Sequence, residues 1–266
     1  MEYIYFGNED KKLFGVYQPP LCAIDKNIGI LLCNPLGQEN TGCQKIYKKL
    51  SKEIADLGIH SLRFDYYGTG DSYGKTSELS IDSIHNDISN AISELREGCE
   101  VEYLYVLGIR FGAIASALLL NSFKVDGLIL WAPVINGNQY IKQIKNNHKK
   151  WFGGTFNKNK KITKDYFENL GFQFSMKFIN ELNKISLKNM FIHDKLKVLL
   201  LDERRIESEE FIELCNDKNI DLDFYEYTNK EFWIKQEDEK SKSMLPVKDI
   251  ELIKEWISQK IIRIID

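Results

Sequence analysis

Residues 103–118 read YLYVLGIRFGAIASAL. The first five form an apolar run typical of a buried strand, and the last six favour a helix. Gly108 and Gly112 lie between them, and residues without a Cβ tolerate a crowded turn and let a strand and a helix pack closely. The stretch therefore predicts a strand, a tight turn and a helix, with Arg110 at the turn beside the helix N-terminus.

The spacing matches the nucleophile elbow, G-x-S-x-G, in which a serine stands on such a turn. Arg110 occupies the serine position in this chain. A guanidinium stays protonated at ordinary pH and cannot attack a carbonyl carbon. The sequence thus predicts the backbone of an elbow that lacks its nucleophile.

Length and composition exclude several classes of protein. The chain has 266 residues, 43% of them hydrophobic, which suffices for one large α/β domain with an insertion. A formal charge of −3 argues against nucleic-acid binding by the whole chain. No segment has the roughly 18 consecutive apolar residues of a membrane span, and the acidic first ten residues are unlike a signal peptide. The five cysteines lack C-x-x-C spacing, so we expect reduced thiols in a cytoplasmic protein with no zinc site. We expect no other metal site and no cofactor.

Short apolar runs alternate with helical patterns, as in a mainly parallel sheet covered by helices on both faces. The first two runs predict an antiparallel hairpin. Strands are expected at 2–6, 13–18, 28–33, 60–65, 103–107, 127–132, 197–202 and 222–227. Helices are expected at 43–57, 80–97, 112–123 and 247–264.

A long insertion separates two of these strands. Residues 136–195 are rich in aromatic side chains and predict a helical cap on a core formed by residues 1–135 and 196–266. Within the cap, residues 142–164 contain eight lysines and no acidic residue. We interpret this positive stretch either as a solvated surface or as a funnel for an anionic ligand.

Further segments accompany the elbow in order along the chain. They read NPLGQEN at 34–40, LRFDYYGTGDS at 62–72, LGIRFGA at 107–113 and LWAPVING at 130–137, with a weaker match over 171–187. Together they resemble the α/β-hydrolase superfamily, and within it the exosortase-associated, serine-aminopeptidase-like group, part of which carries arginine in the elbow. The resemblance implies an α/β-hydrolase fold: a mostly parallel, eight-stranded sheet flanked by helices, with a helical cap. It supplies no reaction.

Two of the three triad positions hold the wrong chemistry. Hydrolases of this fold carry nucleophile, acid and histidine in that chain order. The acid position points to Asp202 or Glu203, whereas the histidine position falls near Glu231, and no histidine follows His193. We therefore expect no Ser–His–Asp catalysis, and whether the chain is an enzyme stays open.

Cys33 is the best substitute nucleophile in the sequence. It ends a strand beside the expected oxyanion loop, where a nearby cation would favour its thiolate. The interpretation of Cys33 as a small buried residue has more support, because no histidine accompanies it.

Arg110 itself leaves two interpretations open. In the first, it joins a helix N-terminus and the backbone N–H groups of the oxyanion hole to bind a carboxylate or phosphate. In the second, it pairs with an internal acid, because an unpaired buried charge costs several kcal/mol. The candidate acids are Glu39, Asp202 and Glu231. The expected ligand contacts are Arg110, Phe111, Leu36, Asn34, Gln38 and Glu39.

Three classes of function follow. The first is a non-hydrolytic protein that binds an anionic small molecule, a peptide or an acyl-carrier substrate in a biosynthetic or export pathway. The second is an isomerase, epimerase or lyase in which Arg110 stabilises an enolate and a glutamate moves the proton. The third is a weak esterase or thioesterase that uses Cys33 or water. The oligomeric state is open, a homodimer included.

Overall fold

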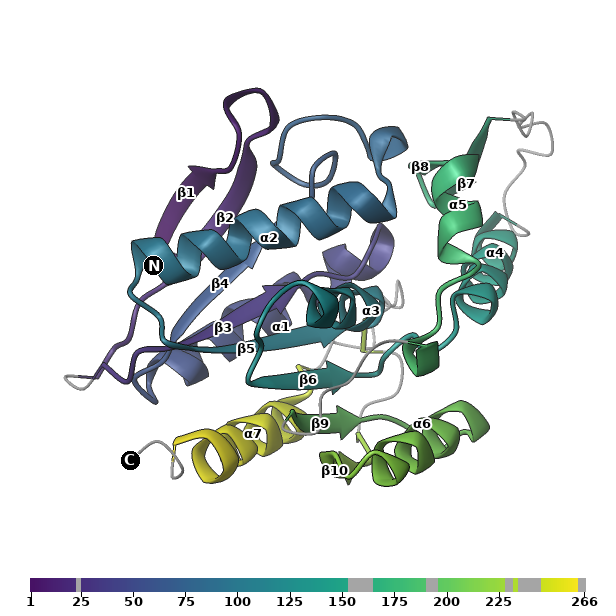
Figure 1. Cartoon of the computed structure of the whole chain (residues 1–266). Coiled ribbons are helices and arrows are strands. Elements are labelled where there is room, and N and C mark those ends of the chain that lie inside the picture. Colours follow the sequence, from purple (N-terminus) through teal and green to yellow (C-terminus); the bar gives the residue numbers. More distant parts are fainter. Residues whose placement is uncertain (23–24, 153–164, 190–195, 228–231, 234–244, 263–266) are drawn as a thin grey trace.

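An eight-stranded sheet forms the centre of the molecule (Figure 1). The structure is a computed structural model that describes residues 1–22, 25–152, 165–189, 196–227, 232–233 and 245–262. The strands of the sheet are β1 (Glu2–Phe6), β2 (Leu13–Gln18), β3 (Ile28–Cys33), β4 (His60–Phe64), β5 (Tyr103–Ile109), β6 (Gly127–Trp131), β9 (Lys197–Leu201) and β10 (Asp221–Tyr225).

The strand order is β1-β2-β4-β3-β5-β6-β9-β10. The pairs β1–β2 and β2–β4 are antiparallel, and the remaining pairs are parallel. The parallel strands end at the same edge of the sheet, so the loops that follow β3, β5, β6 and β9 meet there. This mostly parallel, eight-stranded sheet confirms the fold class expected from the sequence.

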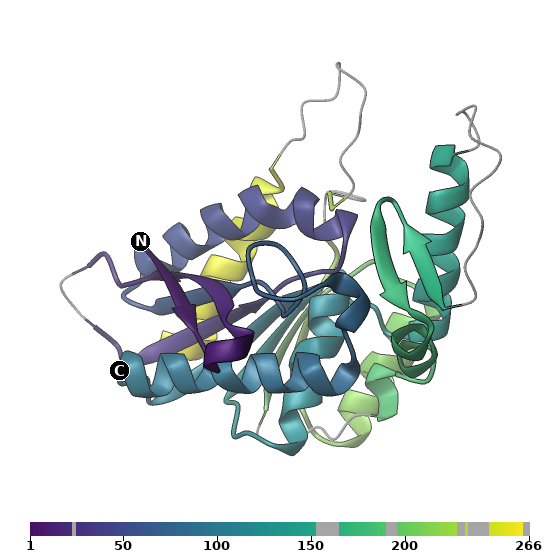
Figure 2. The same cartoon turned by 90° about the horizontal axis from the view of Figure 1, so that it is seen from above.

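Helices cover both faces of the sheet (Figure 2). One face packs against α1 (Gln38–Ala55) and α7 (Val247–Trp256), and the other against α2 (Ile81–Gly98), α3 (Phe111–Leu118) and α6 (Ile206–Asp217). Strand β5 shows why both faces are covered. Leu104 and Val106 belong to the core on the α2 and α3 side, whereas Tyr105 and Leu107 belong to the core on the α1 side. Successive side chains of a strand point to opposite faces, so a strand that is apolar throughout has to be buried on both.

Helix α1 begins earlier than the sequence pattern indicates. Its first residue is Gln38, whereas apolar periodicity predicted a helix over 43–57. The first turn carries no apolar residue for the sheet, so hydrophobic spacing could not reveal it. As a consequence Gln38 and Glu39, expected in a loop, are fixed in the first turn of a helix.

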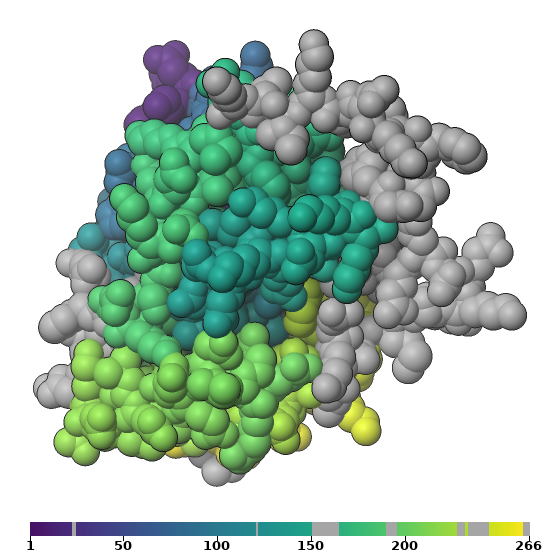
Figure 3. All heavy atoms as spheres, turned by 90° about the vertical axis from the view of Figure 1, so that its right-hand side faces the viewer, coloured from purple at the N-terminus to yellow at the C-terminus, as the bar shows by residue number. Residues whose placement is uncertain are grey.

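The insertion between β6 and β9 is not purely helical. It contains α4 (Gly137–Phe152), a hairpin of β7 (Tyr166–Asn169) and β8 (Phe172–Ser175), and α5 (Met176–Leu182). Leu170 and Gly171 form the hairpin turn, both with positive φ, as a tight two-residue turn requires. In Figure 3 these elements lie above α6. The hairpin was not predicted, because its strands of four residues are too short for a clear alternating pattern.

Two absences hold for the part of the chain that the structure describes. None of its helices combines the length and the apolar character needed to cross a bilayer. Within the same residues, no three His, Cys, Asp or Glu side chains are grouped as a metal ion would require.

Asp87 of α2 makes the stability of the fold depend on pH. Its buried carboxylate accepts a hydrogen bond from the Tyr67 N–H at 2.8 Å, and burial raises its pKa from 3.8 to about 7. Between these two values the folded chain binds more protons at this site than the unfolded chain does. The contribution of Asp87 to the free energy of unfolding is therefore largest at low pH and is lost as pH rises towards 7.

We predict that Asp87→Asn removes this part of the pH dependence. Urea unfolding measures the free energy of unfolding of both proteins. As the pH is raised from acidic to neutral, the stability of Asp87→Asn relative to the wild type should increase. Asp82→Asn, at an exposed position in the first turn of the same helix, is the control for replacing a carboxyl group of α2 by an amide. Parallel pH curves for wild type and Asp87→Asn would contradict the prediction.

Candidate functional site

Arg110 stands on a strained turn between β5 and α3. Its φ of 56° and ψ of −118° lie where side chains with a Cβ are rarely found. The turn is crowded, because a Cβ on Gly108 would lie 2.3 Å from the Gly112 backbone, and one on Gly112 would lie 1.9 Å from the Cys33 carbonyl oxygen. The strand, tight turn and helix expected from residues 103–118 are therefore confirmed.

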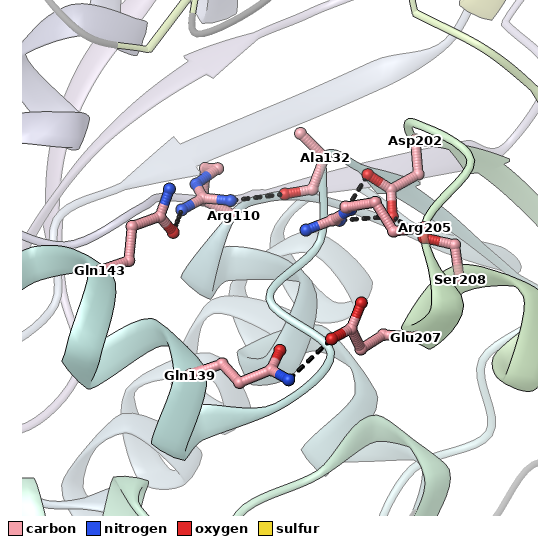
Figure 4. A network of polar contacts seen from close by, with 8 residues as sticks. All are labelled: Arg110, Ala132, Gln139, Gln143, Asp202, Arg205, Glu207 and Ser208. Carbon is pink, nitrogen blue, oxygen red and sulfur yellow. Dashed lines mark hydrogen bonds and ion pairs between the residues drawn. The ribbon is translucent and has the colours of Figure 1, made fainter.

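The Arg110 guanidinium is enclosed by hydrogen-bond acceptors. Its Nε donates to Glu39 Oε1 at 3.2 Å, its Nη1 to the Ala132 carbonyl oxygen at 3.4 Å, and its Nη2 to Gln143 Oε1 at 2.6 Å. Figure 4 shows the contacts to Ala132 and Gln143. The residue is only 3% exposed. Of the two candidate acids that the structure describes, Glu39 pairs with Arg110, whereas Asp202 pairs with Arg205.

Two aromatic rings complete the surroundings of this guanidinium. Its carbon lies 4.4 Å from the centre of the Trp233 ring and 5.6 Å from that of Tyr140. Tyr140 also donates its hydroxyl hydrogen to Glu39 Oε2 at 2.9 Å. Burial lowers the pKa of Arg110, but Glu39, Tyr140 and Tyr227 together raise it, and the net shift is upward. Arg110 therefore stays charged, and α4 of the cap is tied to the core through Tyr140 and Gln143.

Asp202, the expected acid of the triad, is held by a different arginine (Figure 4). It follows β9, is fully buried, and accepts hydrogen bonds from Arg205 Nη2 at 2.6 Å on each oxygen and from Ser208 Oγ at 2.6 Å. Burial raises the pKa of Asp202, although Arg205 opposes this shift. Arg205 and Ser208 thus occupy the Asp202 carboxylate oxygens that would orient the histidine of a triad.

No histidine of the described chain is hydrogen-bonded to Asp202. His60 bonds to Tyr17 and Asp25, and His85 bonds to Ser122. Glu231, the residue expected near the histidine position, lies outside the described residues. Trp233, from the same part of the chain after β10, is the residue whose ring lies over Arg110.

Three further residues of the predicted site are Cys33, Asn34 and Phe111. Cys33 is fully buried, and burial raises its pKa to about 12, so its thiol is both enclosed and protonated. Asn34 donates to the Phe64 carbonyl oxygen at 2.6 Å and to Asp65 at 3.2 Å, which is a structural role. Phe111 begins α3, so its N–H has no acceptor within the helix.

Two cavities adjoin the site on either side of α4. The first, which we name the cap pocket, has a volume of about 380 Å³. The second, the side pocket, has a volume of about 230 Å³ and lies between α4 and α6. The cap pocket is lined by Leu36, Gln38, Glu39, Tyr140, Ile144, Asn147, Lys150, Asn169, Leu170 and Trp233. The lining of the side pocket includes Arg110, Asn136, Gln139, Tyr140, Gln143, Arg205 and Glu207.

The ligand contacts predicted from the sequence are distributed over the two cavities. Leu36, Gln38 and Glu39 face the cap pocket, whereas Arg110 faces the side pocket together with Arg205. Sequence reasoning missed Tyr140, Gln143, Trp233 and Arg205. Only Arg205 left a signal, since it lies three residues after Asp202 at the start of α6.

The sheet, the strained turn and the cap define an α/β-hydrolase-fold protein. The chain belongs to the serine aminopeptidase S33 family (Hydrolase_4), which matches residues 42–201. No curated protein matches its sequence.

Solved structures share the fold at low sequence identity. Est1E from Butyrivibrio proteoclasticus, solved with ferulic acid, is 15% identical with a TM-score of 0.66 over 97% of this chain and 99% of its own. An α/β serine hydrolase without lid from Xanthomonas campestris is 12% identical, with a TM-score of 0.61 over 98% and 94%. A soluble variant of monoglyceride lipase from Saccharomyces cerevisiae is 14% identical, with a TM-score of 0.65 over 97% and 94%.

We predict that Arg110 and Glu39 are strongly coupled. Arg110→Ala leaves the Glu39 carboxylate without its cation, so the free energy of unfolding should fall by about 3–5 kcal/mol. The double variant Arg110→Ala/Glu39→Ala should lose less than the sum of the single variants, by roughly 0.5–3 kcal/mol. Urea denaturation measures all three.

An exposed ion pair provides the matched control. Arg204 bonds to Glu209 at 3.1 Å on the surface, and Arg204→Ala should cost at most about 1 kcal/mol. Strict additivity of Arg110→Ala and Glu39→Ala would show that the pair does not act as a unit.

Proposed function

We propose that this protein is a non-hydrolytic member of its family that binds an anionic small molecule. The observation that carries the proposal is the state of Arg110, a charged and enclosed side chain at the elbow, where a hydrolase needs a hydroxyl nucleophile. Asp202 supports it, because Arg205 occupies both of its oxygens. The absence of any histidine after His193 supports it as well.

The side pocket is the proposed binding site for the anionic group of the ligand. Arg110 and Arg205 both line it, and each already neutralises one carboxylate. A bound anion therefore has to accept hydrogen bonds from arginine N–H groups that do not already donate to Glu39 or Asp202. Arg205 Nε is buried and has no acceptor within the described residues. A guanidinium carries five N–H donors, of which the contacts of Arg110 use three.

The size and the remaining polar lining of the side pocket suit a small carboxylate or phosphate. Gln139 and Gln143 are amide side chains that donate and accept, so they can serve an oxygen-rich ligand. Glu207 also faces the pocket, where its negative charge opposes an anion and the positive charges of Arg110 and Arg205 favour one. Gln139 Nε2 donates to Glu207 at 2.6 Å (Figure 4). The ligand chemistry proposed is thus one anionic group held between two guanidiniums, with amides around it.

A second candidate function is proton transfer by Glu39. This carboxylate lines the cap pocket and is positioned by both Arg110 and Tyr140. A glutamate held in this way next to a cavity is suited to move a proton in an isomerase, epimerase or lyase. Exchange of substrate C–H hydrogen for deuterium from solvent would distinguish this function from binding alone.

We predict no hydrolytic turnover. p-Nitrophenyl esters and aminoacyl p-nitroanilides should be cleaved no faster than in buffer, and a fluorophosphonate probe should not label the chain. Arg110→Ser should stay inactive, because the histidine is missing too. A serine hydrolase of the same fold serves as the positive control. Ester hydrolysis by the wild type that a single pocket substitution abolishes would overturn the proposal.

We also predict binding of inorganic phosphate at the side pocket, followed by calorimetry or by NMR titration. Arg205→Gln should weaken it about ten- to hundredfold, since a hydrogen bond to a charged group is worth about 1.5–3 kcal/mol. Glu39→Gln should strengthen it, because Arg110 then has no internal carboxylate. Acetate should compete with phosphate, and neutral acetamide should not.

Arg204→Gln is the control for that experiment. Arg204 neighbours Arg205 in sequence but bonds to Glu209 on the surface. Its substitution should leave phosphate binding unchanged. Equal weakening by Arg204→Gln and Arg205→Gln would reduce the effect to general charge and would remove the side pocket from the proposal.

A further inference from the structure

A third cavity lies apart from the site, on the opposite side of the N-terminal turn of α1. It has a volume of about 440 Å³, within the range of small-molecule sites, which is about 300–1,000 Å³. We name it the hairpin pocket, because β1 and β2 form one wall. That wall carries Tyr3 and Phe14, and the adjoining polar wall is formed by Arg63 of β4 with Asn40, Gln44 and Asp71.

The aromatic wall is formed by β1 and β2, the first two strands in the order of the sheet. Figure 1 shows β1 and β2 at one edge of the sheet, with α2 across one face. Tyr3 pairs with Val16, which pairs with Arg63, so these three side chains project from the same face. Phe14 is two residues from Val16 and shares that face. Tyr3 is 66% exposed, and its ring stacks on Phe14 with 6.2 Å between centroids.

The polar wall is a connected set of planar groups. Arg63 Nη1 donates to Gln44 Oε1 at 3.2 Å, and Gln44 Nε2 donates to Asn40 Oδ1 at 2.7 Å. These bonds fix the orientation of two amides and one guanidinium. Arg63 is half-buried and forms no ion pair with any described residue, so its remaining N–H groups are available to a ligand.

We propose that the hairpin pocket binds a saccharide. A sugar ring has an apolar face of C–H groups, which packs on the rings of Tyr3 and Phe14. It also has a rim of neighbouring hydroxyls, which planar amide, guanidinium and carboxylate groups bind in pairs. The carboxylate of Asp71 stands on the same wall as Arg63 and disfavours a simple anion, whereas it accepts hydrogen bonds from hydroxyls.

The experiment uses the full chain and defined sugars. Methyl α-D-glucopyranoside, methyl α-D-mannopyranoside, methyl β-D-galactopyranoside, N-acetylglucosamine and glucuronic acid are each titrated at millimolar concentration by saturation-transfer NMR. We expect saturable binding of at least one. Tyr3→Ala should weaken it about fivefold or more, and Tyr3→Phe should stay within about twofold of wild type, because the ring is kept. Gln44→Ala should weaken binding as well.

Tyr166→Ala is the matched control, since Tyr166 is also exposed but lies on β7 of the cap. Tyr3 and Tyr166 are surface residues, so none of these substitutions at position 3 or 166 threatens the fold. If no sugar binds, if Tyr3→Ala binds as tightly as wild type, or if indole binds and no sugar does, the proposal is wrong.

Discussion

The ion pair between Arg110 and Glu39 is the interaction on which the site depends. Arg110 is placed by a strained backbone turn that costs about 1–3 kcal/mol, and its charge is buried at 3% exposure. Neither condition persists without compensation from the surroundings. Glu39 supplies the charge, and Gln143 and the Ala132 carbonyl supply hydrogen-bond acceptors. The position of α1, whose first turn carries Glu39, and the position of α4, which carries Gln143, are therefore coupled to the elbow.

The sequence predicted the parts of this arrangement that follow from local pattern. The spacing of Gly108 and Gly112 predicted the turn. The structure shows why both are glycine, because a Cβ at either position would collide with backbone atoms. The continuous apolar runs predicted the strands, because a strand of a sheet that is buried on both faces is apolar along its whole length. Charge alone indicated that Arg110 needs an acid, and Glu39 was one of three named. The choice among the three required the register of α1 against the sheet, which no local pattern encodes.

What the sequence could not predict comes from elements far apart in the chain. Tyr140 and Gln143 meet Arg110 from the inserted segment, and Trp233 meets it from the loop after β10. Trp233 depends on Gly42, since a Cβ there would lie 2.2 Å from the Trp233 carbonyl oxygen. That glycine lies inside helix α1, where it lowers helix propensity, and its role is visible only once the packing is known.

Glu39 and Asp202, the two described acids that the sequence placed near the elbow, are each bound to an arginine. An arginine–carboxylate pair satisfies two charges and offers no hydroxyl nucleophile. The pairs Asp202–Arg205 and Glu39–Arg110 together form a polar wall at this edge of the sheet, beside the two cavities. Tyr140 lines both cavities and donates to Glu39, so a change at the Glu39–Arg110 pair would also change the hydrogen bonding of Tyr140. That one side chain therefore connects the lining of the side pocket with the lining of the cap pocket.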